Sequence, residues 1–163
     1  MSAIVRLAGD LIENLSRRGE TLTCAESLTG GALAKSITDV AGASKVFLGS
    51  LVTYSNDSKV SLAGLDPIII ERHGTVSSEV AVAMAEGARK RIGSTWSIAT
   101  TGIAGPGPYK GMPAGLVWIA VAGPYKAFEK LELGDLGREQ VRDGAVIGAL
   151  ALITRILREH SSS

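Results

Sequence analysis

Two short polar segments contain a serine and a lysine that together can act as nucleophile and base. Ser27 lies in the run AESLTGG (25–31), and Lys59 ends the run VTYSNDSK (52–59). The second run predicts Lys59 near the start of a helix, where the positive end of the dipole disfavours the ammonium ion and lowers its pKa. A neutral lysine can accept the proton of a serine hydroxyl, and Tyr54 can donate a hydrogen bond or relay a proton. Taken singly, each segment is equally typical of helix caps, tight turns and a solvated lysine.

The glycines after Ser27 favour a backbone that faces a ligand. Gly30 and Gly31 follow a short β-prone segment, residues 21–25, and open a helix. Glycine lets the main chain approach a ligand closely, and free N–H groups at a helix start attract anions. We therefore expect the N–H groups near Thr29, Gly30 and Gly31 to bind substrate and to form an oxyanion hole.

A third polar segment, TTGIAGPG (100–107), supplies hydroxyls and small residues after another β-prone stretch. It lacks the spacing of a Walker A loop, and its glycines do not match the dinucleotide-binding fingerprint. Thr101 and Gly102 are candidates for hydrogen bonds to a ligand, and the alternative interpretation is a flexible connecting loop.

Composition limits the classes of protein that remain. The chain has 163 residues, a net charge of +1 and 45% hydrophobic residues, which predicts one core-rich domain over residues 1–163. Near-neutrality argues against a partner bound through bulk charge, so neither nucleic acid nor a membrane is expected. One cysteine, Cys24, and two histidines leave little material for a metal site, and neither a metal nor a cofactor is predicted. The 20 glycines, about 12% of the chain against roughly 7% usually, point to loops or close packing.

Helical and β-prone segments mostly alternate, which predicts a three-layer α/β domain with a mixed sheet. The mixed sheet follows from one adjacent pair of strands, expected as a hairpin turned at Gly123-Pro124. We expect helices at 2–18, 30–40, 57–63, 67–73, 78–91 and 137–159, strands at 21–25, 46–54, 96–101, 115–121 and 127–133, and a frayed tail at 161–163.

The N-terminal segment reads as an amphipathic helix that stops at Gly19 and not as a targeting signal. The longest apolar run, Ala145–Ile153, is far shorter than the roughly 20 residues that span a membrane. A cytoplasmic protein is expected.

Five ordered blocks carry a resemblance that no single motif supports. The chain resembles the CinA C-terminal domain family, whose stand-alone members include PncC-type nicotinamide mononucleotide deamidases. The resemblance extends from the first helix to the last, and the blocks that carry it are AESLTGG, VTYSNDSK, GTVSSE, TTGIAGP and MPAGLVWIAV.

The resemblance implies an α/β domain with a mixed sheet and a metal-free amidase. Active members of the family hydrolyse the carboxamide of nicotinamide mononucleotide to nicotinic acid mononucleotide and ammonia, using a serine with a lysine partner. Motif by motif, these residues are Ser27 and Lys59, with Tyr54 beside the lysine.

The phosphate and ribose of such a substrate need further partners. Ser77 of the GTVSSE block and Asn56 are candidates, as are Arg138 and Arg142 in the first turns of the last helix. A guanidinium suits a phosphate group, although solvated helix charges are an equally good interpretation of both arginines.

The chain departs from the family pattern at three places. Leu28 follows the serine where a cysteine is usual, Gly107 stands where an aspartate is usual, and Arg138 comes late after the Gly-Asp pair at 134–135. Two other functions remain open: a catalytically inactive nucleotide-binding or regulatory module, and a protein-interaction role linked to competence or DNA damage. The low charge and the resemblance favour a homodimer.

Overall fold

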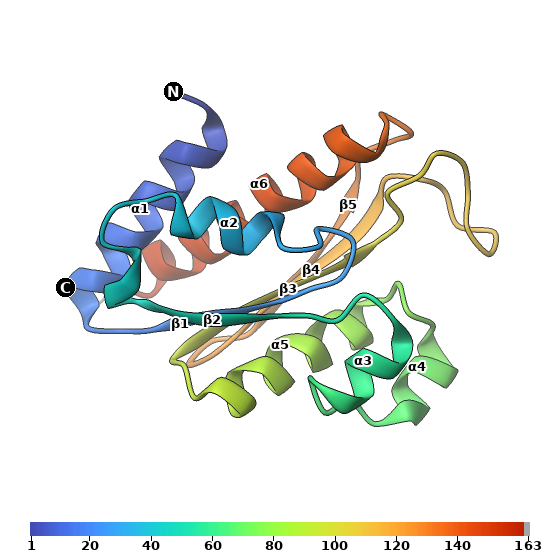
Figure 1. Ribbon diagram of the computed structural model, residues 1–163, viewed down its shortest axis with the longest axis horizontal. Helices are drawn as coiled ribbons and strands as arrows, with labels where there is room; N and C mark the ends of the chain where they lie inside the picture. The colour runs from blue at the N-terminus through green and yellow to red at the C-terminus, as the bar shows by residue number, and fades with distance from the viewer. Residues whose placement is uncertain (162–163) are drawn as a thin grey trace.

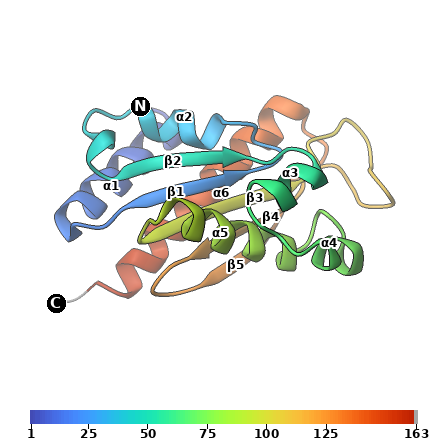
Figure 2. The ribbon, with the colours of Figure 1, turned by 60° about the horizontal axis from the view of Figure 1, so that its bottom comes forward.

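A five-stranded mixed sheet forms the centre of the computed structural model, which describes residues 1–161. Its strand order is β2-β1-β3-β4-β5, visible in Figure 2. The first three strands are parallel, and β4 and β5 each run antiparallel to the strand before them. The strands are β1 (Leu22–Glu26), β2 (Phe47–Val52), β3 (Trp96–Gly102), β4 (Leu116–Ala122) and β5 (Ala127–Glu132).

Helices cover both faces of this sheet, so the predicted three-layer α/β fold with a mixed sheet is confirmed. Figure 1 shows α1, α2 and α6 on one face and α3, α4 and α5 on the other. The helices are α1 (Ala3–Arg18), α2 (Ala32–Thr38), α3 (Asn56–Ser61), α4 (Pro67–His73), α5 (Ser78–Ile92) and α6 (Arg138–Glu159), with a 3₁₀ turn, η1 (Ala43–Lys45).

Among the boundaries that differ from the sequence prediction, two bear on the site. Helix α2 begins at Ala32, because Gly30 and Gly31 have positive φ angles of 56° and 107° and form a turn before it. Strand β2 ends at Val52, so Thr53 and Tyr54 leave the sheet. Of the tail expected at 161–163, residues 162 and 163 lie outside the described part of the chain.

Small residues bring the α3–α4 segment close to the sheet. Helix α5 packs alanines against alanines of the sheet in the second core cluster. A Cβ on Gly87 of α5 would lie 1.8 Å from the carbonyl oxygen of Ala63, just after α3. Only glycine allows this approach, which holds the helix that carries Lys59 against the rest of the domain.

The two strands that follow β1 in the chain lie on opposite sides of it in the sheet. The chain passes from β1 through α2 to β2 on one side, then through α3, α4 and α5 to β3 on the other side. The carboxyl end of β1 is therefore a topological switch point, where open α/β sheets usually bind ligands. Ser27 follows β1 directly at this point.

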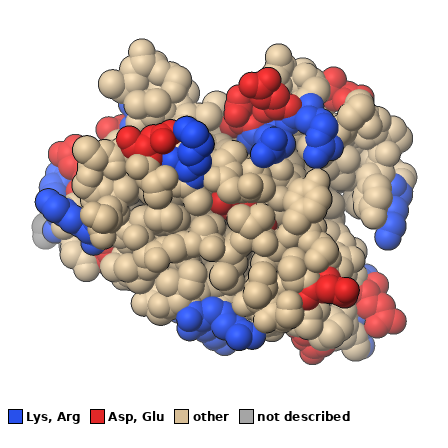
Figure 3. Space-filling model, viewed as in Figure 1, with Lys and Arg blue, Asp and Glu red and all other residues tan. Residues whose placement is uncertain are grey.

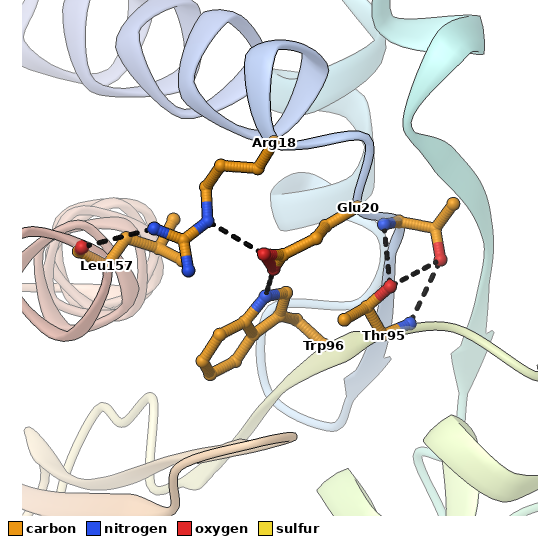
Figure 4. Close-up of polar contacts among 6 residues, drawn as sticks. Arg18, Glu20, Thr95, Trp96 and Leu157 are labelled. Atoms are coloured by element: carbon orange, nitrogen blue, oxygen red, sulfur yellow. Dashed lines mark hydrogen bonds and ion pairs between the residues drawn. The ribbon is translucent and has the colours of Figure 1, made fainter. Parts of the chain in front are cut away.

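A cluster of polar contacts lies at the amino end of β1 and β3, opposite the end that Ser27 follows (Figure 4). Glu20 accepts hydrogen bonds from Arg18 Nε at 2.8 Å and from the Trp96 indole N–H. The N–H groups of Thr21 and Thr95 each donate to the other's hydroxyl, at 3.0 and 2.9 Å. These bonds join the segments just before β1 and β3. They help to fix the register of the two strands at the end of the sheet opposite Ser27.

Within residues 1–161, no helix is long and apolar enough to cross a membrane. On the face shown in Figure 3, charged side chains lie in small groups, some of them with both acidic and basic members.

Candidate active site

Ser27 opens into a pocket at the carboxyl end of the parallel strands. Its N–H donates to the carbonyl oxygen of Thr100 at 3.0 Å, which ties the residue after β1 to β3. The residue is only 7% exposed, yet it lines a pocket of about 340 Å³. The other lining residues are Leu28, Tyr54, Ser55, Asn56, Thr75, Val76, Gly102, Ala104, Tyr109 and Arg138.

Lys59 lies completely buried beside Ser27. It is carried by α3, whose start is fixed by a capping box in which the Ser55 and Ser58 side chains each bond the other's backbone. The Lys59 Nζ atom lies 2.9 Å from Ser27 Oγ. The structure thus brings together the serine and the lysine that the first two motifs contain, 32 positions apart in the chain.

Three oxygen atoms surround the Lys59 nitrogen. Besides Ser27 Oγ, it lies 2.7 Å from the carbonyl oxygen of Thr53 and 3.5 Å from that of Tyr54. An ammonium ion can donate to all three oxygens. The neutral amine has two N–H donors for the carbonyl oxygens and one lone pair that can accept the proton of Ser27, which is the arrangement that a base requires.

Burial lowers the pKa of Lys59 from 10.5 to about 8. The sequence predicted this direction but ascribed it to the start of a helix, whereas loss of solvent around the ammonium ion is the cause. A lysine with this pKa is neutral in roughly a tenth of the molecules at pH 7 and in half of them at pH 8.

The turn after Ser27 uses the N–H groups of both its glycines for bonds to neighbouring residues. Gly30 N–H donates to the Ser27 carbonyl at 3.1 Å, and Gly31 N–H donates to the carboxylate of Glu26 at 3.2 Å. The N–H groups of Gly30 and Gly31, which the sequence predicted as part of an oxyanion hole, are therefore already hydrogen-bonded. Across residues 1–161, the N–H groups of Leu28 and Thr29 find no protein acceptor.

Hydrogen bonds of Thr29 and Arg142 connect this turn to β3 and α6. The Thr29 hydroxyl lies 2.8 Å from that of Thr100, and both residues are fully buried. Arg142, on α6, donates from Nε to the Leu28 carbonyl at 3.0 Å and from its terminal nitrogen to the Thr29 carbonyl at 3.1 Å. The sequence proposed Arg142 as a phosphate partner, but its guanidinium contacts backbone oxygens and does not line the pocket.

Tyr54 and Arg138 form the mouth of the pocket. The Tyr54 side chain is exposed, and its hydroxyl lies 3.3 Å from Arg138, away from the Lys59 nitrogen. Arg138 also donates to the Gly105 carbonyl at 2.7 Å and lines an adjoining cavity of about 260 Å³. This placement suits binding of a substrate better than a direct proton relay to Ser27.

The remaining candidate residues divide between the pocket and the scaffold. Asn56 and Gly102 line the pocket, and Asn56 accepts a hydrogen bond from Thr75 at 2.7 Å. Thr101 is buried and donates to the Thr75 carbonyl at 2.8 Å, while Ser77 caps α5 by accepting from Val80 N–H. Neither Thr101 nor Ser77 lines the pocket.

Sequence reasoning missed two groups that shape the site. Glu26 is fully buried, and its carboxylate accepts from the N–H groups of Gly31, Leu33 and Ala34 at the start of α2. An acidic residue in an otherwise apolar strand was the available signal. Tyr109 lies on the projecting loop between β3 and β4 and lines both cavities, and an exposed aromatic side chain in a polar loop could have indicated it.

In residues 1–161, no cluster of three or more His, Cys, Asp or Glu side chains is placed to hold a metal ion. Cys24 is buried, and burial raises the pKa of its thiol well above 9.0, with Glu26 adding to the effect. The thiol is therefore protonated and poorly nucleophilic.

The sequence profile of the CinA C-terminal domain matches residues 5–157. The chain belongs to this family. A CinA-like protein of Frankia casuarinae is 42% identical over 93% of this chain, and one of Parasynechococcus marenigrum is 46% identical over 95%. The chain covers only 35% and 38% of these relatives, so it spans little more than a third of their length.

Solved structures of the family share the fold closely. The competence/damage inducible protein CihA of Agrobacterium tumefaciens matches with a TM-score of 0.91 and 34% identity, over 95% of this chain and 96% of that chain. A CinA superfamily protein of Escherichia coli matches with a TM-score of 0.91 and 33% identity, over 94% and 90%.

Proposed function

We propose that this CinA-family chain is a cytoplasmic amidohydrolase that converts nicotinamide mononucleotide to nicotinic acid mononucleotide and ammonia. The observation that carries the proposal is the 2.9 Å contact between Ser27 Oγ and a buried Lys59 whose pKa is about 8. A serine hydroxyl is a weak nucleophile unless a base accepts its proton, and this lysine is such a base. The substrate class comes from the family resemblance of the motifs that hold both residues.

The first half of the reaction forms an ester on Ser27. The Oγ atom attacks the carboxamide carbon as its proton moves to the neutral amine of Lys59, which gives a tetrahedral intermediate with a negatively charged oxygen. The carbon–nitrogen bond then breaks, and the Lys59 ammonium returns the proton to the departing nitrogen, which leaves as ammonia.

The second half restores the enzyme with water. A water molecule attacks the ester carbonyl while Lys59 accepts one of its protons. The bond to Ser27 Oγ breaks, the same proton returns to Oγ, and nicotinic acid mononucleotide is released as the acid, which loses its remaining proton to the solvent. The lysine thus serves as base and acid in turn, and no group outside the chain is consumed except water.

The pocket also offers contacts for the rest of a nucleotide. Its volume of about 340 Å³ lies within the range of roughly 300–1,000 Å³ of small-molecule sites. Two exposed tyrosines, Tyr54 and Tyr109, line it, and aromatic side chains suit contact with a ring. Arg138 is the cation at the mouth, and its guanidinium fork suits a phosphate group.

Ammonia release from nicotinamide mononucleotide, with chromatographic detection of nicotinic acid mononucleotide, tests the proposal. We expect both products in equal amounts from the purified wild-type chain. Tight binding of the nucleotide without either product would overturn the amidase and support the inactive regulatory module instead.

The rate should follow the protonation of Lys59. Because the reaction requires the neutral amine, kcat/KM should rise about tenfold per pH unit below pH 7 and level off above about pH 8. A pH–rate profile in buffers of constant ionic strength measures this. A flat profile between pH 6 and 9 would contradict a lysine base.

Arg138→Gln should weaken binding of the phosphorylated substrate. Because Arg138 lies at the mouth and away from Ser27, KM should rise by roughly tenfold while kcat changes little, as expected for one lost charged hydrogen bond. Steady-state kinetics with nicotinamide mononucleotide and with nicotinamide riboside check the assignment. An equal change for both substrates would contradict a phosphate contact.

A further inference from the structure

Arg142 has an unusual environment for an arginine near an anionic substrate. It is partly buried on α6, and within residues 1–161 no carboxylate lies within 4.0 Å of it. Its guanidinium donates to two successive carbonyl oxygens, those of Leu28 and Thr29. Its charge is thus directed at the main chain of the turn that follows Ser27.

The geometry of a trans peptide gives these two bonds a consequence. The carbonyl and the N–H of one peptide unit point in opposite directions. Holding the Leu28 carbonyl toward Arg142 therefore turns the Thr29 N–H away from α6. The Ser27 carbonyl accepts from Gly30 N–H at 3.1 Å, which in the same way turns the Leu28 N–H outward from the turn.

Glu26 removes the competing donors from this turn. Its carboxylate accepts from the N–H groups of Gly31 and Leu33 at 3.2 and 2.9 Å, and from Ala34 at 3.1 Å. The N–H groups at the start of α2 are therefore bonded to the buried Glu26 side chain and are not available to an anion. Within residues 1–161, the N–H groups of Leu28 and Thr29 are the two of this turn that find no protein acceptor, and of these two residues only Leu28 lines the pocket.

We propose that Arg142 is a positioning residue, which holds the Leu28 carbonyl and so fixes the backbone of Leu28, whose N–H in the pocket lining forms the oxyanion hole for the reaction of Ser27. The inference rests on the proposed serine amidase and deepens it. Gly30 supplies the positive φ of 56° that this turn requires, a conformation that favours glycine.

Labelling of Ser27 by an alkyl fluorophosphonate tests this without the natural substrate. Oγ forms a bond to phosphorus, the phosphorus–fluorine bond breaks, the proton passes to Lys59 and fluoride leaves. The phosphoryl oxygen occupies the oxyanion hole. Intact-mass spectrometry should show Arg142→Gln labelled roughly 10²-fold more slowly than the wild type, as for loss of one oxyanion donor.

Arg155→Gln is the matched control, since Arg155 lies on the same helix and pairs with Glu129 at the surface. It should be labelled at the wild-type rate. Equal rates for the Arg142 and Arg155 variants, or a wild-type Ser27 that is not labelled, would overturn the proposal. If circular dichroism shows that Arg142→Gln does not fold, Arg142→Lys replaces it. We expect this variant to slow labelling less, because an ammonium ion can reproduce one of the two bonds but not both.

Two substrates separate positioning from phosphate binding. A positioning role predicts that Arg142→Gln lowers kcat by the same factor for nicotinamide mononucleotide and nicotinamide riboside, with KM little changed. A rise in KM confined to the mononucleotide would overturn the positioning role. A wild type that is labelled but hydrolyses neither substrate would end the proposed function, while the labelling rates still decide the role of Arg142.

Discussion

Replacing Ser27 by alanine should reduce ammonia release from nicotinamide mononucleotide by about 10³-fold or more, because the atom that attacks the carboxamide is removed. Binding of the substrate should persist, since the other lining residues of the pocket are unchanged. Initial rates and the dissociation constant from calorimetry measure the two effects separately. The pair of results would place Ser27 in the chemical step.

Ser78→Ala is the matched control, because Ser78 lies at the start of α5 outside the pocket. It should keep the wild-type rate. Turnover by Ser27→Ala within about tenfold of the wild type would show that another nucleophile, such as an activated water molecule, carries the reaction.

Lys59→Met should abolish turnover to a similar extent while leaving the chain folded. Methionine has about the length of the lysine stem and no nitrogen to accept the Ser27 proton. The exposed Lys90 provides a control, and Lys90→Met should retain full activity. A Lys59→Met variant that still forms the Ser27 ester at the wild-type rate would rule out the lysine as base.

The same variant should remove a pH-dependent part of the stability. The lowered pKa means that the unfolded chain binds a proton at Lys59 between about pH 8 and 10.5, where the folded chain does not. Wild-type stability relative to Lys59→Met should therefore fall as the pH drops from 10.5 to 8, by on the order of 3 kcal/mol, and stay constant below. Urea unfolding of both chains across this range measures the difference.

A parallel change of both chains with pH would show that Lys59 has an ordinary pKa in the folded protein. In that case the geometry beside Ser27 would remain, but the amine would be charged at neutral pH and could not act as the base. Stability and catalysis are linked here, because burial both destabilises the ammonium form and creates the base.

Local sequence was enough to predict most elements and the class of fold. The alternation of helical and β-prone segments, with one hairpin near the end, indicated the mixed sheet that the structure has. Helix α5 begins after Ser77 and ends before Gly93, as its cap residues predict. Such signals depend on neighbours within a few positions, so they can be interpreted without the tertiary structure.

The turn after Ser27 shows where local reasoning stops. Two glycines and a helix start suggested an oxyanion hole at Gly30 and Gly31, but the carboxylate of Glu26 and the carbonyl of Ser27 occupy those donors. The carbonyl of Leu28 in the same turn accepts a hydrogen bond from Arg142, which lies more than a hundred positions away in the chain. No local pattern contains that contact.

The sequence by itself therefore determined the family motifs, the fold class and the two residues, Ser27 and Lys59, with the right chemistry. Only the tertiary structure decided that their atoms lie 2.9 Å apart, that burial lowers the pKa of the amine, and that Arg142 contacts the main chain. The physical reason is that pKa, burial and donor satisfaction depend on everything packed around a group. That packing joins β1, α3 and α6, which meet only in the folded domain.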